Sequence, residues 1–127
     1  KTFESKNMKF TIQIPNDFDI LEKLTFADLT SKEGKINIGR IATDFNSISD
    51  YLKDFDSKRK IQVKEENQVS INGYSTMKRV EKFNAGPIEQ QKVYFILVDN
   101  WVYSISTSAQ NLYSDLDQIA QSFRYTP

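Results

Sequence analysis

The sequence of 127 residues contains neither cysteine nor histidine. Without cysteine there is no disulfide framework and no thiolate chemistry. Without histidine the chain lacks the usual general base, the Ser-His and Cys-His nucleophile pairs and the commonest ligand of transition metals. We therefore predict no catalytic residue, no metal site and a protein that is not an enzyme. A histidine-free hydrolase with a Ser-Lys pair is the least favoured alternative, because no such pair stands out.

Glycine is also scarce, and net charge is absent. The four glycines are isolated, at positions 34, 39, 73 and 86, so neither a phosphate-binding P-loop nor a dinucleotide fingerprint can be written. Seventeen basic and seventeen acidic residues cancel, so no overall field would attract the chain to nucleic acid. We predict no bound cofactor and no nucleic-acid partner.

Long apolar runs are missing as well. No run approaches the roughly 20 residues that a helix needs to span a bilayer. The chain begins at Lys1, which fits either a mature protein whose leader was removed or a trimmed one. We expect contact with a membrane only through a leader or lipid anchor that these residues do not include.

The residues that are present suffice for one hydrophobic core. Hydrophobic residues make up 39% of the chain, with nine Phe and six Tyr among them, which is enough apolar surface to offset chain entropy. The length is typical of one domain, and no repeat, low-complexity tract or linker interrupts it. We predict a single domain over residues 1–127.

Apolar alternation predicts strands in the first third of the chain. Met8–Ile14 alternates with polar residues and stops at Pro15, which is typical of a half-buried strand. Ile20–Leu29 is apolar-rich but irregular in phase, and predicts one extended strand with a possible bulge. After the turn at Glu33-Gly34, Ile36–Ile41 alternates again. These three strands are expected to form a meander.

An Asn-Gly pair gives the strongest local signal. Asn72-Gly73 separates two β-like segments, Ile61–Ile71 and Tyr74–Phe83. Both turn positions of a tight hairpin need a positive φ, which Asn and Gly adopt most readily. The sequence therefore predicts a β-hairpin, followed by a second turn at Asn84–Pro87.

Two further strands follow the hairpin. Val93–Val98 is apolar at six consecutive positions, which predicts an interior strand that is covered on both faces. After a tight turn at Asp99-Asn100, the residues of Trp101–Ile105 alternate again. The second half of the chain is thus expected to contain four consecutive antiparallel strands.

Two segments have helical spacing. Ser47 followed by Asp50 resembles a capping box, and the apolar residues after it predict a helix from about Ser47 to Arg59. A second apolar stripe predicts a helix that packs on the sheet and ends near Arg124. The residues of this stripe are Leu112, Leu116, Ile119, Ala120 and Phe123. Together these elements predict an α+β class with a single antiparallel sheet of about six to seven strands and two main flanking helices.

Three kinds of side chain invite a functional interpretation, and each has a plainer one. The carboxylate pairs lack the spacing of a calcium loop and are expected at the surface. These pairs are Asp17 with Asp19, Asp54 with Asp56, and Asp115 with Asp117. The aromatic residues of the strands could stack on a ligand but more often pack across a sheet. They are Tyr74, Tyr94, Trp101, Tyr103 and Tyr113. The basic run Lys58-Arg59-Lys60 is explained by the end of a helix.

The order of these segments resembles the PsbP-like superfamily, which includes extrinsic photosystem subunits, a Ran-binding nuclear import factor and DcrB-like bacterial lipoproteins. The resemblance covers nearly the whole chain. It rests on the strand Phe10–Pro15 with Phe18, the helix from Ser47, the hairpin Val69–Tyr74, the strand Trp101–Ile105 and the helix Ile119–Phe123.

The resemblance implies an α/β/α sandwich that serves as a non-enzymatic binding or assembly module. Because photosystem members use histidine among their metal ligands and this chain has none, metal-dependent assembly does not carry over. The acidic patch of the Ran-binding branch has no clear match either.

The function expected from this resemblance is a binding or assembly module of the bacterial cell envelope. The protein is then extracytoplasmic, secreted or lipid-anchored, and its partner is another envelope protein. The alternative is a carrier of a small ligand or lipid, with an apolar pocket between a helix and the sheet. The sequence does not assign the binding residues.

Overall fold

Two sheets and two α-helices make up the structure, a computed structural model that describes every residue from Lys1 to Pro127. The smaller sheet consists of β1 (Thr2–Ser5), β2 (Phe10–Gln13) and β10 (Arg124–Tyr125). The larger sheet consists of β3 (Asp19–Glu22), β4 (Phe26–Ser31), β5 (Gly34–Ala42), β6 (Ile61–Ile71), β7 (Tyr74–Phe83), β8 (Gln90–Val98) and β9 (Trp101–Thr107). Its order is β3-β4-β5-β9-β8-β7-β6, and all neighbours are antiparallel. The predicted α+β class with two helices is therefore confirmed.

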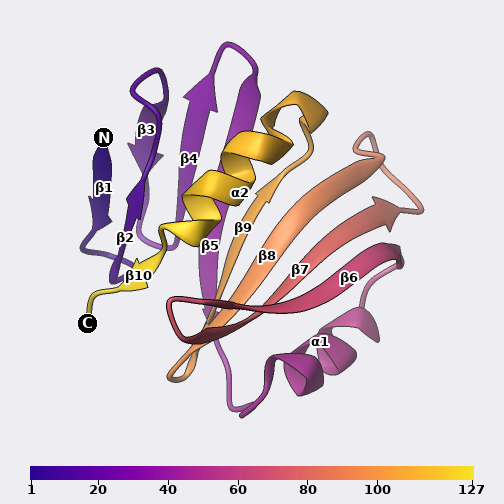
Figure 1. The fold of residues 1–127 in the computed structure, drawn as a ribbon. Coiled ribbons are helices and arrows are strands. Elements are labelled where there is room, and N and C mark those ends of the chain that lie inside the picture. Colours follow the sequence, from indigo (N-terminus) through magenta and orange to yellow (C-terminus); the bar gives the residue numbers. More distant parts are fainter.

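The two helices cover different faces of the large sheet. Helix α2 (Tyr113–Gln121) follows a 3-10 turn at Gln110–Leu112 and lies diagonally across one face, whereas α1 (Ile48–Asp56) lies apart from it, near β6 and β7 (Figure 1). We call the two sides of the sheet the α2 face and the α1 face. Neither helix is long and apolar enough to cross a membrane.

Strand β8 contributes buried side chains to both faces of the large sheet. Tyr94 and Ile96 belong to the hydrophobic cluster that contains α2, whereas Val93 and Phe95 belong to the cluster that contains α1. Alternate residues of a strand point to opposite faces, so a strand covered on both sides has no polar phase. The prediction of an interior strand at Val93–Val98 is confirmed.

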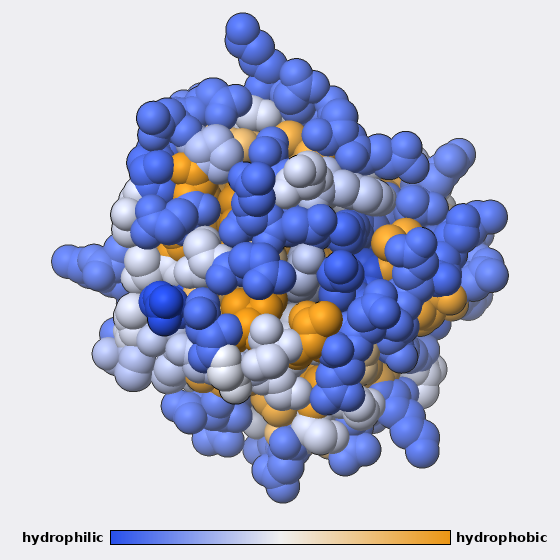
Figure 2. Space-filling view, in the orientation of Figure 1, coloured by the Kyte–Doolittle hydropathy of each residue, from blue (hydrophilic) through white to orange (hydrophobic).

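The α2 face carries most of the core. Its cluster has 21 buried residues, and the cluster beneath α1 has six. The small sheet joins the larger cluster, because the Phe10 ring stacks on Phe123 with centroids 5.8 Å apart. On this side the outer surface is mainly hydrophilic, with small separate apolar areas (Figure 2).

The hairpin and both helices agree with the sequence. Asn72 and Gly73 have φ of 49° and 86°, as the predicted tight turn requires. Ser47 caps α1 through a hydrogen bond of 3.1 Å from the Asp50 amide to its hydroxyl oxygen. The predicted α2 stripe is fully buried. The two helices end three residues earlier than predicted, at Asp56 and Gln121.

Three sequence-based expectations are wrong. Ile20–Leu29 is not one strand but the hairpin of β3 and β4, which reverses where the Lys23 amide donates to the Phe26 carbonyl at 2.8 Å. The irregular phase arose because the chain turns back in the middle of the segment. The predicted first strand is observed as the shorter β2, which belongs to the small sheet and not to a meander with the next strands. The chain therefore forms two sheets and not the single one predicted. Strand β2 pairs with β1 and β10, which are too short to give a sequence pattern.

Candidate binding site beside helix α1

Helix α1 is too short to cover its face of the large sheet. It packs on β7, β8 and β9, where Ile48 and Leu52 contact Met77, Val93 and Val102. Ile41 on β5 is the antiparallel partner of Val102 and so points to the same face, yet 56% of its surface is exposed. Phe26 on β4 also remains 43% exposed. Apolar side chains are thus left uncovered next to the helix.

A groove lies along this uncovered border. Its outer part has a volume of about 440 Å³ and is lined by the segment after β5 and by α1. Its inner part has about 300 Å³ and reaches the sheet. Both parts share Ile41, Tyr51 and Phe55. We call this feature the aromatic groove and define it by Gly39, Ile41, Phe45, Tyr51, Phe55 and Ser104.

The floor of the groove is low because two neighbouring strands carry small residues there. Gly39 on β5 is the antiparallel partner of Ser104 on β9. A Cβ atom built on Gly39 would meet the Ser104 Oγ and the Thr25 carbonyl oxygen at 3.8 Å each, which are ordinary contacts. A larger side chain at position 39 would therefore fill the hollow without a clash at its Cβ.

Aromatic rings form a continuous wall above this floor. The rings of Phe45 and Tyr51 are 6.5 Å apart, those of Tyr51 and Phe55 5.6 Å, and those of Phe55 and Phe95 6.2 Å. The Arg59 guanidinium covers one side of Phe55 at 3.9 Å from the ring centroid. Such offset and edge-on contacts hold the rings in fixed positions.

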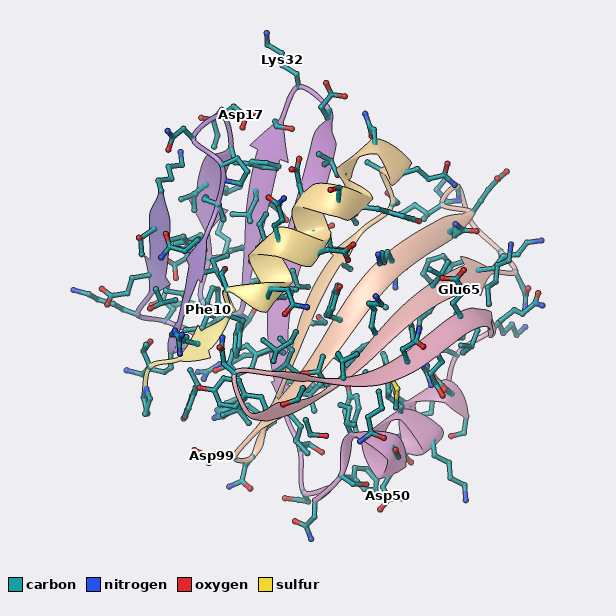
Figure 3. The ribbon with its side chains drawn as sticks, viewed as in Figure 1. Phe10, Asp17, Lys32, Asp50, Glu65 and Asp99 are labelled. Atoms are coloured by element: carbon teal, nitrogen blue, oxygen red, sulfur yellow. The ribbon has the colours of Figure 1, made fainter.

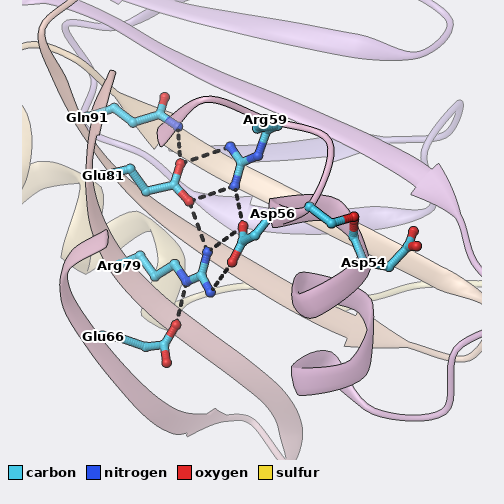
Figure 4. A network of polar contacts seen from close by, with 8 residues as sticks. Asp54, Asp56, Arg59, Glu66, Arg79, Glu81 and Gln91 are labelled. Atoms are coloured by element: carbon cyan, nitrogen blue, oxygen red, sulfur yellow. Dashed lines mark hydrogen bonds and ion pairs between the residues drawn. The ribbon is translucent and has the colours of Figure 1, made fainter. Parts of the chain in front are cut away.

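A network of charges beneath the C-terminus of α1 holds this wall in place (Figure 4). Arg59 donates two hydrogen bonds to the fully buried Glu81, of 3.1 and 2.9 Å. Arg79 donates to both oxygens of Asp56 at 2.9 and 2.8 Å and to Glu66 at 2.6 Å. The network therefore ties the last turn of α1 to β6 and β7.

These contacts change the ionisation of their members. Burial opposes the charge of Asp56, but the hydrogen bonds from Arg79 and Arg59 outweigh it and hold its pKa below the usual value. Burial likewise disfavours the charged form of Arg79, yet Asp56 and Glu66 raise the pKa of its guanidinium. The contacts thus favour the charged forms of Asp56, Arg59 and Arg79, as a network of buried ion pairs needs.

The opening of the groove carries charge as well. Asp54 pairs with Lys58 at 3.0 Å, whereas Asp44 is exposed and forms no ion pair. Burial raises the pKa of the Tyr51 hydroxyl in the wall, an effect that Arg59 partly opposes, so this hydroxyl is neutral at physiological pH. The groove therefore combines apolar rings with an acidic edge.

The aromatic residues singled out in the sequence serve packing. Tyr94 and Tyr103 are buried in the core, and Tyr74 meets Phe123 edge-on at 5.8 Å. Trp101 is half-buried beneath the Arg40 guanidinium, 3.7 Å from its ring centroid. Tyr113 lies 5.7 Å from the Lys92 ammonium group on the α2 face. The interpretation of these rings as sheet packing is confirmed for Tyr94 and Tyr103.

The carboxylate pairs do not form a common site. Asp17 and Asp19 are exposed. Asp117 accepts hydrogen bonds from the Tyr94 hydroxyl at 2.5 Å and from Lys92 at 2.9 Å. Burial and the Asp117 carboxylate together raise the pKa of Tyr94. No group of three or more Asp or Glu residues is placed to hold a metal ion.

No motif of the sequence directly indicates the aromatic groove. Phe55 follows Ile48 and Leu52 at helical spacing, which predicts burial, yet it is only half-buried. Ile41 was placed at the end of a strand, where its exposure depends on how far α1 extends over the sheet. Arg59 was explained as a solvated charge near a helix end and is instead half-buried in an ion-pair network. The one available signal is Gly39 within a strand of alternating apolar and polar residues, because an isolated glycine in a strand indicates a close approach or a hollow.

The architecture is that of the PsbP-like fold, as a comparison with solved structures shows. The solution structure of cyanobacterial PsbP (CyanoP) from Synechocystis sp. PCC 6803 is similar with a TM-score of 0.69 and 9% identity, over 98% of this chain and 91% of that one. The crystal structure of PA94, a protein of unknown function from Pseudomonas aeruginosa, is similar with a TM-score of 0.61 and 13% identity, over 100% and 97% of the two chains. At these identities the likeness describes the fold alone. No family model and no curated protein matches the sequence.

Proposed function

We propose that this chain is a non-enzymatic binding module that engages another protein through the aromatic groove. The observation that supports the proposal is the contrast between a filled core and an open, aromatic-lined groove with a volume of about 440 Å³ in its outer part. Aromatic residues are enriched where proteins bind one another, because they bury a large area with little loss of rotamer freedom.

The groove is also held in one shape before any partner arrives. Phe55 is fixed by Arg59, which Glu81 holds in turn through two hydrogen bonds. A rigid site loses less conformational entropy on binding than a mobile one. The ion-pair network therefore supports binding although it lies outside the groove itself.

We further propose that the module works in the cell envelope of a bacterium, secreted or lipid-anchored, as the resemblance of the sequence implies. The likeness to a cyanobacterial PsbP is compatible with such a location. Fractionation of the native host, with the intact mass of the protein, tests this proposal. A membrane-bound protein carrying the extra mass of acyl chains supports the lipid anchor, and an unmodified cytoplasmic protein contradicts the envelope role.

Photo-crosslinking tests the proposed binding surface. A benzophenone amino acid at position 45, in the groove, is expected to give a covalent adduct with one specific protein in the native host. The matched control is position 88, because Ile88 is an exposed apolar residue in the loop between β7 and β8. Adducts that form equally from both positions, or from neither, would contradict the proposal.

A carrier of a small apolar ligand is the second candidate. The observation that favours it is the inner part of the groove, where Phe55, Phe95 and Val102 line a hollow of about 300 Å³ between α1 and the sheet. Small-molecule sites are concave, mostly apolar and of about this volume or larger. Native mass spectrometry of the purified protein distinguishes the two candidates, since a carrier retains a molecule of defined mass.

A further inference from the structure

The geometry points to a particular occupant of the aromatic groove, namely an extended protein segment that presents an apolar side chain and, two residues away on the same side of its backbone, a lysine or arginine. This inference rests on the proposed function, because it names the chemistry of the partner. It follows from the shape of the floor, the charges at the opening and the arrangement of the two hollows.

The inner hollow accepts an apolar side chain. Its walls are Phe55, Phe95 and Val102, and its floor is a backbone without a side chain at Gly39. An apolar group that enters loses contact with water on several sides, which is the main source of binding free energy. The hydroxyl of Ser104, which also lines the hollow, can meet a backbone amide of the bound segment.

The outer hollow favours a cation beside that group. Asp44 and Asp54 line it against the single lysine Lys58, and Asp50 with Lys53 adds no net charge at its edge. Asp44 lacks a partner within the chain. The rings of Phe45 and Tyr51 add an attraction for a guanidinium or ammonium group. The same charges repel an anionic polymer or an anionic membrane surface.

The two hollows are neighbours and share one wall, made of Ile41, Tyr51 and Phe55. A single extended segment therefore fills both with two side chains that lie two residues apart, because alternate residues of an extended segment point to the same side. Both hollows open to solvent, so a segment can bind from outside without any movement of α1. This is the geometry of a peptide-binding groove, in which apolar pockets give affinity and charge gives selectivity.

A peptide library tests the inference directly. Random peptides are selected for binding to the wild-type chain and against binding to Gly39→Leu, whose side chain fills the inner hollow. We expect the selected peptides to be enriched in an apolar residue two positions away from Lys or Arg. Their affinity for Gly39→Leu should fall at least about tenfold, since a buried apolar side chain loses its site.

The role of the acidic edge is measured with a charge-matched pair of variants. Asp44→Asn should weaken a selected cationic peptide by about three- to fivefold, the range of an exposed ion pair. It should leave a peptide with norleucine in place of the lysine unchanged. Asp17→Asn is the control, because Asp17 is exposed and lies at the opposite end of the molecule from Asp50 of α1 (Figure 3). This control should bind both peptides as the wild type does.

The outcomes distinguish a failure of the inferred partner chemistry from a failure of the proposed function. Peptides that need Gly39 but show no enrichment in basic residues overturn the inference on the partner and leave the proposed function in place. If no peptide depends on Gly39 and crosslinking from position 45 fails as well, both are overturned. A dimer in light scattering that Gly39→Leu dissociates, or binding to anionic lipid vesicles that this substitution abolishes, overturns the inference in favour of a second copy or a membrane.

Discussion

The two faces of the large sheet differ in how completely they are covered. The α2 face is closed by α2 and by the small sheet, and its 21 buried residues form the main core. The α1 face has six buried residues, a nine-residue helix and an open border where Ile41 and Phe26 meet solvent. One face therefore supplies stability, and the other keeps apolar surface available for a partner. This division follows from the length of α1 and from the small sheet, which covers only the α2 face.

The largest effect is expected from the closed face. Phe123→Ala removes a ring that contacts Phe10, Tyr74 and Tyr103 within the core. We expect a loss of about 3–5 kcal/mol in the free energy of unfolding, because a cavity is left where no side chain can collapse fully. Urea denaturation measures the loss.

Phe45→Ala is the control on the open face, since Phe45 is 38% exposed. It should cost less than about 1 kcal/mol, as exposed substitutions usually do. Equal losses for Phe123→Ala and Phe45→Ala would mean that the α2 face does not contribute more to stability than the open α1 face.

The next largest loss of stability is expected from the ion-pair network that ties α1 to β6 and β7. Arg79→Met leaves the fully buried Glu81 and its neighbour Asp56 with one guanidinium fewer. Breaking a buried ion-pair network on one side costs about 3 kcal/mol, because the remaining charges lose their compensation. Urea denaturation should show this loss, and crosslinking from position 45 should weaken because the wall of the groove loses its support.

Lys58→Met provides the comparison, because the Lys58–Asp54 pair is exposed and lies at the C-terminal end of α1. We expect a change below about 0.5 kcal/mol for this substitution. A destabilisation by Lys58→Met as large as that by Arg79→Met would show that α1 is not held by its buried contacts.

A smaller effect is expected where the β6–β7 hairpin reaches across to the end of α2. The Asn72 amide donates hydrogen bonds to the carbonyls of Gln121 and Phe123, at 3.3 and 2.8 Å. Asn72→Asp keeps the shape but replaces these donors with a negative charge at the C-terminal end of a helix dipole. We expect a loss of about 2 kcal/mol.

Asn72→Gly distinguishes the backbone conformation of the turn from the hydrogen bonds that the Asn72 side chain makes. Glycine adopts the φ of 49° without strain but makes neither hydrogen bond, so it should cost less than Asp does. The melting temperatures of the two variants measure the difference. If Asn72→Asp is as stable as the wild type, the hairpin tip does not secure α2.

The sequence predicted the closed face far better than the open one. The stripe of α2 and the two-sided burial of β8 are periodic patterns, and a pattern of that kind is produced by a core. The aromatic groove instead depends on where α1 stops relative to β5, a tertiary property that no local pattern encodes. The hairpin of β3 and β4 was missed because its turn, Lys23–Thr25, contains neither glycine nor proline.

The smallest effect is a pH dependence confined to the open face. Burial opposes the charge of Asp56, but the hydrogen bonds from Arg79 and Arg59 hold its pKa below the ordinary value in the folded chain, so the unfolded chain takes up a proton first as the pH falls. The stabilisation by the Asp56 carboxylate is therefore complete above the unfolded pKa and is lost as the pH falls through the folded one. Asp56→Asn should be about 1–2 kcal/mol less stable than the wild type at neutral pH, the range for a hydrogen bond to a charged group. Urea denaturation at a series of pH values should show this gap closing in acid, because the wild type alone loses the charge. A gap that stays constant down to about pH 2 would mean that the network holds α1 by shape and hydrogen bonding, and that the charge of Asp56 adds nothing.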